Sequence, residues 1–187
     1  MLLLMPALVP GVLVAKETFS SRRRTSTGKQ MCVLRITGKE FDAEKYLALS
    51  GLPAYEVFRR GEPRSKSHPE WKKHEDSGFK VDVSHGSRAN LVEQARDAIA
   101  FLKTHEHALT VLRSAPGVED MRLDFPVDLR IDRKKVFAQF DYFPPELVSR
   151  AGTLGLGLEI SIYPPDLEQL VKAWRVKRLS KKRRTRR

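Results

Sequence analysis

The chain has 187 residues, of which 41% are hydrophobic, and a formal net charge of +12. Its single cysteine, Cys32, excludes an intrachain disulfide bond and any zinc site built from several cysteines. No apolar stretch approaches the roughly 20 residues that a transmembrane helix needs, so we expect no membrane span.

The excess positive charge lies at the two ends of the chain. Residues 177–187 hold eight bases and no acid, and residues 1–29 hold five bases and one acid. The stretch 30–176 has 22 bases and 22 acids, so it is neutral. A basic composition favours nucleic-acid binding only where the charge lies, which limits that argument to the tail. We therefore predict a disordered leader (1–30), one domain (31–176) and a disordered basic tail (177–187).

The first 15 residues are apolar and have some features of a signal peptide. No basic residue precedes them, two prolines interrupt them, and no clear cleavage site follows. We therefore interpret the segment as a leader and expect the protein in the cytoplasm. Met31, which opens the first strand-like segment, is an alternative start of translation.

The front of the domain alternates between strand and helix patterns. Residues 32–37 alternate apolar and polar side chains, which predicts a strand with Cys32 buried on its apolar face. Residues 41–51 form a predicted helix that begins at Asp42 and ends at Gly51. A short strand follows at 55–59.

A charged segment, 61–78, is predicted to be a long loop. The preferred interpretation packs its tryptophan, Trp71, against the sheet. The alternative makes Trp71, Arg59, Arg60 and Arg64 a partner-binding loop, because aromatic and basic side chains together suit single-stranded nucleic acid.

The middle of the domain contains the strongest helical pattern. Residues 79–83 alternate as a strand, and 87–103 carry an apolar stripe at helical spacing, with Ser87 as the expected N-cap. A second helical segment, 104–114, ends before a Pro-Gly pair.

A long alternating strand is predicted at 121–131. Pro126 falls on its polar face, which indicates an edge position or a bulge. Residues 136–142 alternate as well, so we predict an antiparallel hairpin with a turn at 133–135. The acids and arginines on the polar face, Asp124 among them, are interpreted as a solvated ladder of cross-strand pairs.

The back of the domain repeats the strand and helix pattern weakly. A short helix is predicted at 144–151, a strand at 154–162, and a final helix from 164 whose apolar stripe ends at Trp174. Segments 32–58 and 136–162 share an order of strand, short helix, Gly-Leu and strand. Together these elements predict an α+β fold, an antiparallel sheet of about five to six strands with helices packed mainly on one face.

Residues 31–163 resemble the bacterial family catalogued as domain of unknown function 4279. The motifs that carry the resemblance are Cys32–Gly38, Phe41–Glu44, Leu49–Pro53, Val57–Glu62, Pro145–Val148 and Leu154–Tyr163. The resemblance implies no assigned reaction and no catalytic residues. It implies a binding module, for which neutralising a toxin is one role.

The motifs of common enzymes are missing from the sequence. It has no Gly-x-Ser-x-Gly, no phosphate-binding loop and no dinucleotide fingerprint. His68 and His74 lie near acidic residues, but their spacing matches no known metal-ligand pattern. We therefore expect no metal, no cofactor and no catalytic site. An unrecognised enzyme that uses the loop around His68, Trp71 and His74 stays open as a lesser hypothesis.

Two functions are favoured over that lesser hypothesis. The first is a non-enzymatic binding module, in its narrower form an immunity-type protein, with a protein partner that the sequence does not identify. The alternative is a nucleic-acid-associated protein anchored by its tail, because clustered bases bind polyanions without sequence preference. The bases concerned are Lys177, Arg178, Lys181, Lys182, Arg183, Arg184, Arg186 and Arg187.

Overall fold

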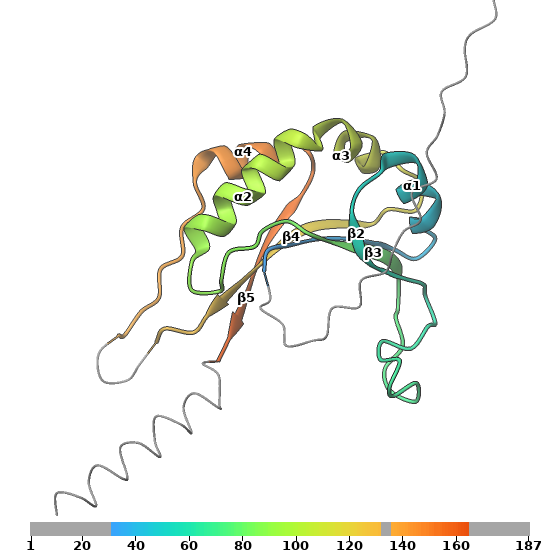
Figure 1. Ribbon diagram of the computed structural model, residues 1–187, viewed down its shortest axis with the longest axis horizontal. Helices are drawn as coiled ribbons and strands as arrows, with labels where there is room; N and C mark the ends of the chain where they lie inside the picture. Colours follow the sequence, from blue (N-terminus) through green and yellow to red (C-terminus); the bar gives the residue numbers. More distant parts are fainter. Residues whose placement is uncertain (1–30, 132–135, 165–187) are drawn as a thin grey trace, which may run out of the picture.

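The computed structural model describes residues 31–131 and 136–164 as one layer of strands beneath one layer of helices (Figure 1). The elements in chain order are β1 (Val33–Gly38), α1 (Ala43–Ser50), β2 (Ala54–Phe58), β3 (Ser77–Asp82), α2 (Leu91–Thr104), α3 (Glu106–Arg113), β4 (Asp120–Asp128), α4 (Pro145–Thr153) and β5 (Gly157–Tyr163).

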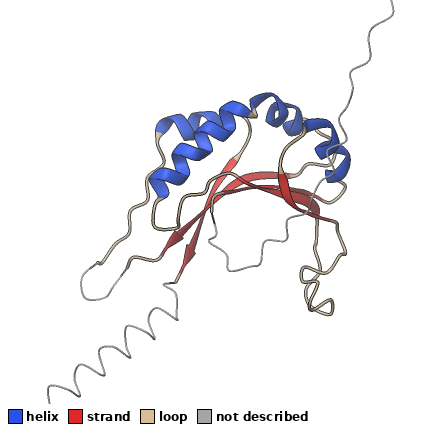
Figure 2. Ribbon diagram, in the orientation of Figure 1, coloured by secondary structure: helices blue, strands red, loops and turns tan. Residues whose placement is uncertain are grey.

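The five strands form one sheet in the order β2-β3-β1-β4-β5. Neighbouring strands in this sheet are antiparallel, except β4 and β5, which are parallel and are connected through α4. All four helices lie on one face of the sheet (Figure 2). The predicted α+β fold, with a mainly antiparallel sheet and helices on one face, is confirmed.

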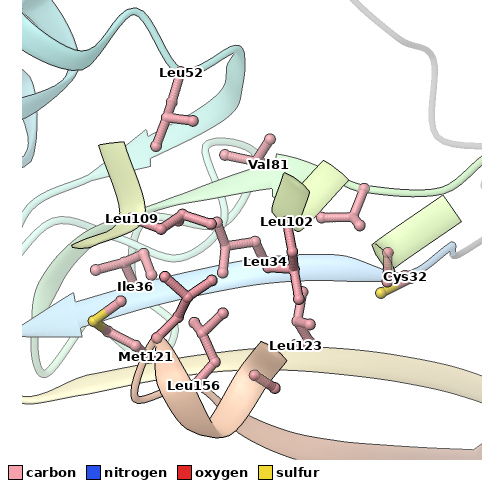
Figure 3. Close-up of a cluster of buried hydrophobic side chains, with 14 of the residues drawn as sticks. Cys32, Leu34, Ile36, Leu52, Val81, Leu102, Leu109, Met121, Leu123 and Leu156 are labelled. Carbon is pink, nitrogen blue, oxygen red and sulfur yellow. The ribbon is translucent and has the colours of Figure 1, made fainter. Parts of the chain in front are cut away.

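The hydrophobic core lies between the sheet and the helices (Figure 3). The alternating apolar residues of β1, β3 and β4 point into it, and the inward residues of α2 and α3 meet them there. Its fully buried members include Cys32, Leu34, Ile36, Phe79, Val81, Leu102, Leu109, Leu123 and Phe125.

Local capping interactions fix both ends of α1 and the start of α2. The Asp42 side chain accepts a hydrogen bond from Lys45 N–H at 3.0 Å, and Gly51 ends α1 with a φ of 66°, both as predicted. The N-cap of α2 is Asn90, whose side chain accepts from Glu93 N–H at 3.1 Å. The prediction of Ser87 at that place is wrong, because the chain turns for three more residues before the helix begins.

Residues 136–142 do not form the predicted hairpin strand. They return toward α4 as an irregular arm, and Arg130 N–H donates to the Gln139 side chain at 2.9 Å. The arm leaves the sheet because Phe143 packs against Phe125 on the helix-covered face, with ring centroids 4.8 Å apart. The second half of the weak repeat therefore lacks its first strand. The predicted turn at 133–135 lies outside the described residues.

Pro126 lies in β4, which is an inner strand of the sheet, although the sequence indicated an edge strand or a bulge. The N–H of Leu129 bonds to β5, so the alternate residues of β4, including Pro126, face β1. However, β1 begins with Val33 opposite Asp124, so Pro126 lies beyond its end and no ladder bond is lost. The Gln94 side chain donates to the Pro126 carbonyl at 3.0 Å.

Among the described residues, no helix is both long enough and apolar enough to cross a membrane. The predicted leader, nearly all of the final helix and the basic tail fall outside the described part of the chain.

Candidate functional site

The sheet face opposite the helices carries charged side chains in rows across the strands. The register places Lys80 of β3 and Arg122 of β4 directly opposite Arg35 of β1, one on each side. Three cations thus follow one another across the centre of the sheet. We call this surface the open face and define it by Val33, Arg35, Tyr55, Glu56, Lys80, Asp82, Asp120, Arg122, Asp124, Asp128, Glu159 and Ser161.

The two outer cations of this row are neutralised by carboxylates. Lys80 Nζ lies 2.9 Å from Glu56, and Arg122 lies 2.7 Å from Asp120 and 3.0 Å from Glu159. Hydrogen bonds to Asp120 and Glu159 raise the pKa of Arg122, so its guanidinium is always charged. These pairs are the cross-strand and same-strand contacts that a solvated sheet face ordinarily makes.

Arg35, the central cation, lacks such a partner. Within the described residues its half-buried side chain makes no hydrogen bond or ion pair, and its Nε is buried. A buried donor without an acceptor costs about 1–3 kcal/mol, and like charges directly opposite on neighbouring strands repel. In the described structure Arg35 therefore has a favourable charge interaction with Asp124 but no hydrogen bond for its buried Nε.

Asp124, on the neighbouring strand β4, has a carboxylate oxygen without a hydrogen-bond donor in the described structure. One carboxylate oxygen accepts a hydrogen bond from Ser161, but Oδ1 is buried and has no partner in the described structure. Burial raises the pKa of Asp124, and Glu159 adds to this, while the Ser161 hydrogen bond and the charge of Arg35 oppose it. An unused donor and an unused acceptor thus lie on adjacent strands of the open face.

Tyr55 adds an aromatic side chain to the same surface. It lies at an irregularity in β2, where the register with β3 shifts between Ala54 and Glu56, and it is 50% exposed. Burial of its hydroxyl, together with the charges of Glu56, Asp82 and Asp124, raises the pKa of Tyr55. Its hydroxyl therefore remains protonated at neutral pH and can donate a hydrogen bond.

The charged segment after β2 is an ordered hairpin that projects from the sheet on the side away from the helices (Figure 1). Pro63 and Lys73 form a β-bridge, and Gly61 N–H donates to the His74 carbonyl at 2.9 Å. We call residues 61–76 the hairpin. Two further backbone hydrogen bonds cross its stem, from Arg64 N–H to the Lys72 carbonyl and from His74 N–H to the Glu62 carbonyl.

Trp71 lies exposed on the hairpin rather than packed against the sheet. Its side chain is 60% exposed and stacks on His68, with ring centroids 4.0 Å apart and planes within 8°. The preferred sequence interpretation of Trp71 is therefore wrong. The ring that packs in the place expected for Trp71 is that of His74, which stacks on the buried Phe58 with ring centroids 4.4 Å apart.

The other residues of the predicted partner-binding loop lie at two different places in the structure. Arg59 and Arg60 lie at the base of the hairpin, where Arg59 pairs with Glu44 and Arg60 with Glu40, both beside the start of α1. Arg64 lies on the hairpin itself, with the exposed tryptophan. The residues predicted to bind polyanions lie outside the described residues: Lys177, Arg178, Lys181, Lys182, Arg183, Arg184, Arg186 and Arg187.

The remaining reactive side chains form no recognisable centre. In residues 31–131 and 136–164, no group of three or more His, Cys, Asp or Glu side chains could hold a metal ion. His68 lies 3.3 Å from Glu70 on the exposed hairpin. Cys32 is fully buried, as expected, and burial raises the pKa of its thiol well above the ordinary value. A protonated thiol without access to solvent is a poor nucleophile.

The sequence model of one known protein family matches most of the chain. Residues 26–165 match the sequence model of a family described as Domain of unknown function (DUF4279). The chain belongs to this family. The match extends from before β1 to just past β5, so it includes all the described strands and confirms the resemblance found in the sequence motifs. No curated protein matches the chain, and no solved structure matches it.

Sequence reasoning did not single out the central residues of the open face of this DUF4279 protein. Alternation alone put Arg35 on the polar side of its strand, and Asp124 was interpreted as one rung of a solvated ladder. Only the strand order and register show that Arg35 lies between two other cations and next to an unsatisfied carboxylate. The sequence feature that could have pointed to this site was Arg35 itself, a lone base on the polar side of the first strand.

Proposed function

We propose that this DUF4279 protein is a non-enzymatic binding module that holds a protein partner against its open face. The observation that supports this most is Arg35, a half-buried cation without a hydrogen-bond partner in the described structure, beside the unpartnered Oδ1 of Asp124. Both side chains are only partly buried, so a partner could reach the accessible end of each and offer an acceptor to Arg35 and a donor to Asp124. Hydrogen bonds in which one group is charged are stronger than those between neutral groups, so such contacts would favour binding.

The balance of charge on the open face favours a protein over a nucleic acid. A polyanion would be repelled by a surface with more acids than bases, whereas a protein can present charges of both signs. The bases on its strands are Arg35, Lys80 and Arg122, and the acids are Glu56, Asp82, Asp120, Asp124, Asp128 and Glu159.

The hairpin offers a second contact for the same partner. It projects on the side of the open face, and its Trp71 is exposed and held by the stack on His68 (Figure 1). Tryptophan and arginine are the residues that most often dominate the energy of protein interfaces. A tryptophan that is already stacked on a neighbouring ring before binding should lose less side-chain entropy on binding than a free one.

The narrower form of the proposal is an immunity-type protein that neutralises a toxin in the cytoplasm. The excess of acids on the open face suits a basic toxin, such as one that acts on nucleic acids. Rescue of growth when the protein is co-expressed with its captured partner would support this form, and a partner that is harmless in the cell would contradict it.

The binding proposal is tested by differential capture. The full-length protein is immobilised and exposed to a lysate of its source organism, beside the Arg35→Gln variant and an Arg96→Gln control. Arg96 is 74% exposed on α2, in the helix layer on the other side of the sheet. A partner retained by the wild type and the control should bind the Arg35→Gln variant about 10-fold to 100-fold more weakly, since hydrogen bonds to charged groups contribute about 1.5–3 kcal/mol.

Circular dichroism first establishes that both variants are folded. Equal retention of every captured protein by the Arg35→Gln variant would contradict a binding role for the open face. Retention of no protein by the wild type would contradict the proposal as well.

We also propose the alternative role, nucleic-acid association, for the tail alone. The supporting observation is the run of eight bases without an acid in residues 177–187. Duplex DNA binding by the full chain should fall steeply with salt and should disappear when the eight bases are replaced by glutamine. Salt-sensitive binding that survives this replacement would contradict the role.

A further inference from the structure

Within residues 31–131 and 136–164, no strand pairs with the outer hydrogen-bonding edge of β5. This strand lies at the end of the sheet order and pairs only with β4 in the described structure. The carbonyl of Tyr163 accepts from Leu129 N–H at 2.7 Å, so it faces β4. Because backbone groups alternate along a strand, the N–H and C=O groups of Leu158, Ile160 and Ile162 face outward. Their groups are a ready template for another strand.

The opposite edge of the sheet is protected against such pairing. Strand β2 is five residues long, its register is broken between Ala54 and Glu56, and Arg59 and Arg60 follow it directly. Strand β5 is seven residues long, its pairing has no irregularity, and Gly157–Tyr163 contains no lysine, arginine or proline. Proteins commonly protect edges with these residues or with bulges. Strand β5 contains one charged residue, Glu159, and is followed directly by Pro164, but it has no bulge and no base, so it is the more open of the two edges.

The side chains of β5 also have an uncovered apolar side. Ile160 is 37% exposed and Ile162 is 58% exposed, although both point to the same face as the buried core residues Phe125 and Val127. The helices cover the first part of β5 but not its end (Figure 1). A partner that pairs with the edge and brings its own helix layer would bury both isoleucines.

We propose that the occupant is a second copy of this chain, paired antiparallel through β5 about a two-fold axis at Ile160. This register places Ile160 opposite its own mate, Leu158 opposite Ile162, and Glu159 opposite Ser161. All outward N–H and C=O groups then exchange bonds in pairs, which gives about six backbone hydrogen bonds. Apolar residues meet apolar residues on the helix side, and the interface is isologous, as two-fold symmetry requires.

The neighbouring registers that keep the helix layers on one face are worse. An axis at Glu159 places two carboxylates opposite each other, and like charges at directly opposite positions are unfavourable. An axis at Ser161 places Leu158 opposite Pro164, which has no N–H to donate. The axis at Ile160 avoids both defects and pairs the whole of β5.

The dimer would bury the end of β5 for a simple geometric reason. Because the two strands run in opposite directions, the partner's first β5 residues, over which its α4 packs, lie beside Ile162. The two sheets become one continuous sheet with all helices on the same side. The open faces then join into one surface that carries two copies of Arg35, so the pairing adds to the proposed binding function without depending on it.

The test is the mass of the full-length protein in solution, measured by light scattering at micromolar concentration. The wild type should have the mass of two chains. Ile160→Lys places two charges opposite each other at the axis and should weaken dimerisation at least tenfold. The matched control is Val57→Lys on the protected edge β2, where Val57 is 40% exposed; this variant should remain a dimer. A monomeric wild type, or a dimer that survives Ile160→Lys, would overturn the proposal.

A crosslinking experiment then checks the register. Cys32 is fully buried, so a short bis-maleimide reacts only with an introduced thiol. Ile160→Cys should crosslink rapidly to its mate. Ile162→Cys should crosslink far more slowly, because its two copies lie about 13 Å apart along the paired strands. Crosslinking that is faster at Ile162→Cys would contradict the axis at Ile160.

Discussion

The two faces of the sheet are made by the same strands but are built on different principles. On the covered face, Leu34, Phe79 and Leu123 are fully buried among apolar neighbours. On the open face, Arg35 and Arg122 alternate with them, only partly buried. Burial of apolar area supplies most of the stability of a domain, whereas polar surface contributes little. The covered face therefore stabilises the fold, which leaves the open face free to carry a polar site that stability alone does not require.

The largest predicted difference between the two faces comes from removing one aromatic ring from each. Phe79→Ala should lower the free energy of unfolding by about 3–5 kcal/mol, because the ring is fully buried and lies against Phe41 and Tyr46. Tyr55→Ala, on the open face, should cost much less. Urea denaturation measures both, and a Tyr55→Ala cost equal to that of Phe79→Ala would contradict the division of roles.

A smaller difference is predicted within the open face itself. Arg122→Met should destabilise the domain by about 1 kcal/mol, because it leaves Asp120 and Glu159 without their partner in a half-exposed setting. Arg35→Met should change stability by less than about 0.5 kcal/mol, since the loss of its attraction to Asp124 is offset by the removal of a buried Nε without an acceptor. Denaturation of the two variants side by side gives the comparison. A larger loss at Arg35 would show that Arg35 has a structural role.

The smallest predicted effect depends on pH. Burial raises the pKa of Asp124, so the folded protein holds that proton more tightly than the unfolded chain does. The stability from this group is full below 3.8, the ordinary pKa of aspartate, and is lost as the pH rises through the raised pKa. Asp124→Asn keeps the site neutral, so its denaturation midpoint should match wild type at low pH and exceed it slightly at pH 7. A lower midpoint at pH 7 would show that the charged carboxylate stabilises the fold.

Local patterns in the sequence predicted most of the elements. Alternation placed β1, β3 and β4, and capping chemistry fixed the start and end of α1 at Asp42 and Gly51. These features depend on neighbours within a few residues, so the sequence contains them directly. The prediction of a strand at 136–142 was wrong, because alternation cannot distinguish a strand from an extended arm that leaves the sheet to reach a helix.

The open face could not be predicted from the sequence, because it depends on pairing between distant segments. Arg35 meets Lys80 and Arg122 only through the register of three strands. A shift of one residue in either pairing would turn one of these side chains to the other face. Trp71 was misplaced for a related reason, since His74 rather than Trp71 packs on Phe58.

The strand order also has a consequence for how the chain folds as it is made. Strand β1 is the first described element along the chain, yet it lies in the middle of the sheet, between β3 and β4. A ribosome therefore releases β1 long before β4, its second neighbour, is synthesised, and the edge of β1 that pairs with β4 stays open in that interval. Such long-range pairing slows folding and exposes aggregation-prone edges. The nascent chain should consequently depend on chaperones until residues 120–128 have left the exit tunnel.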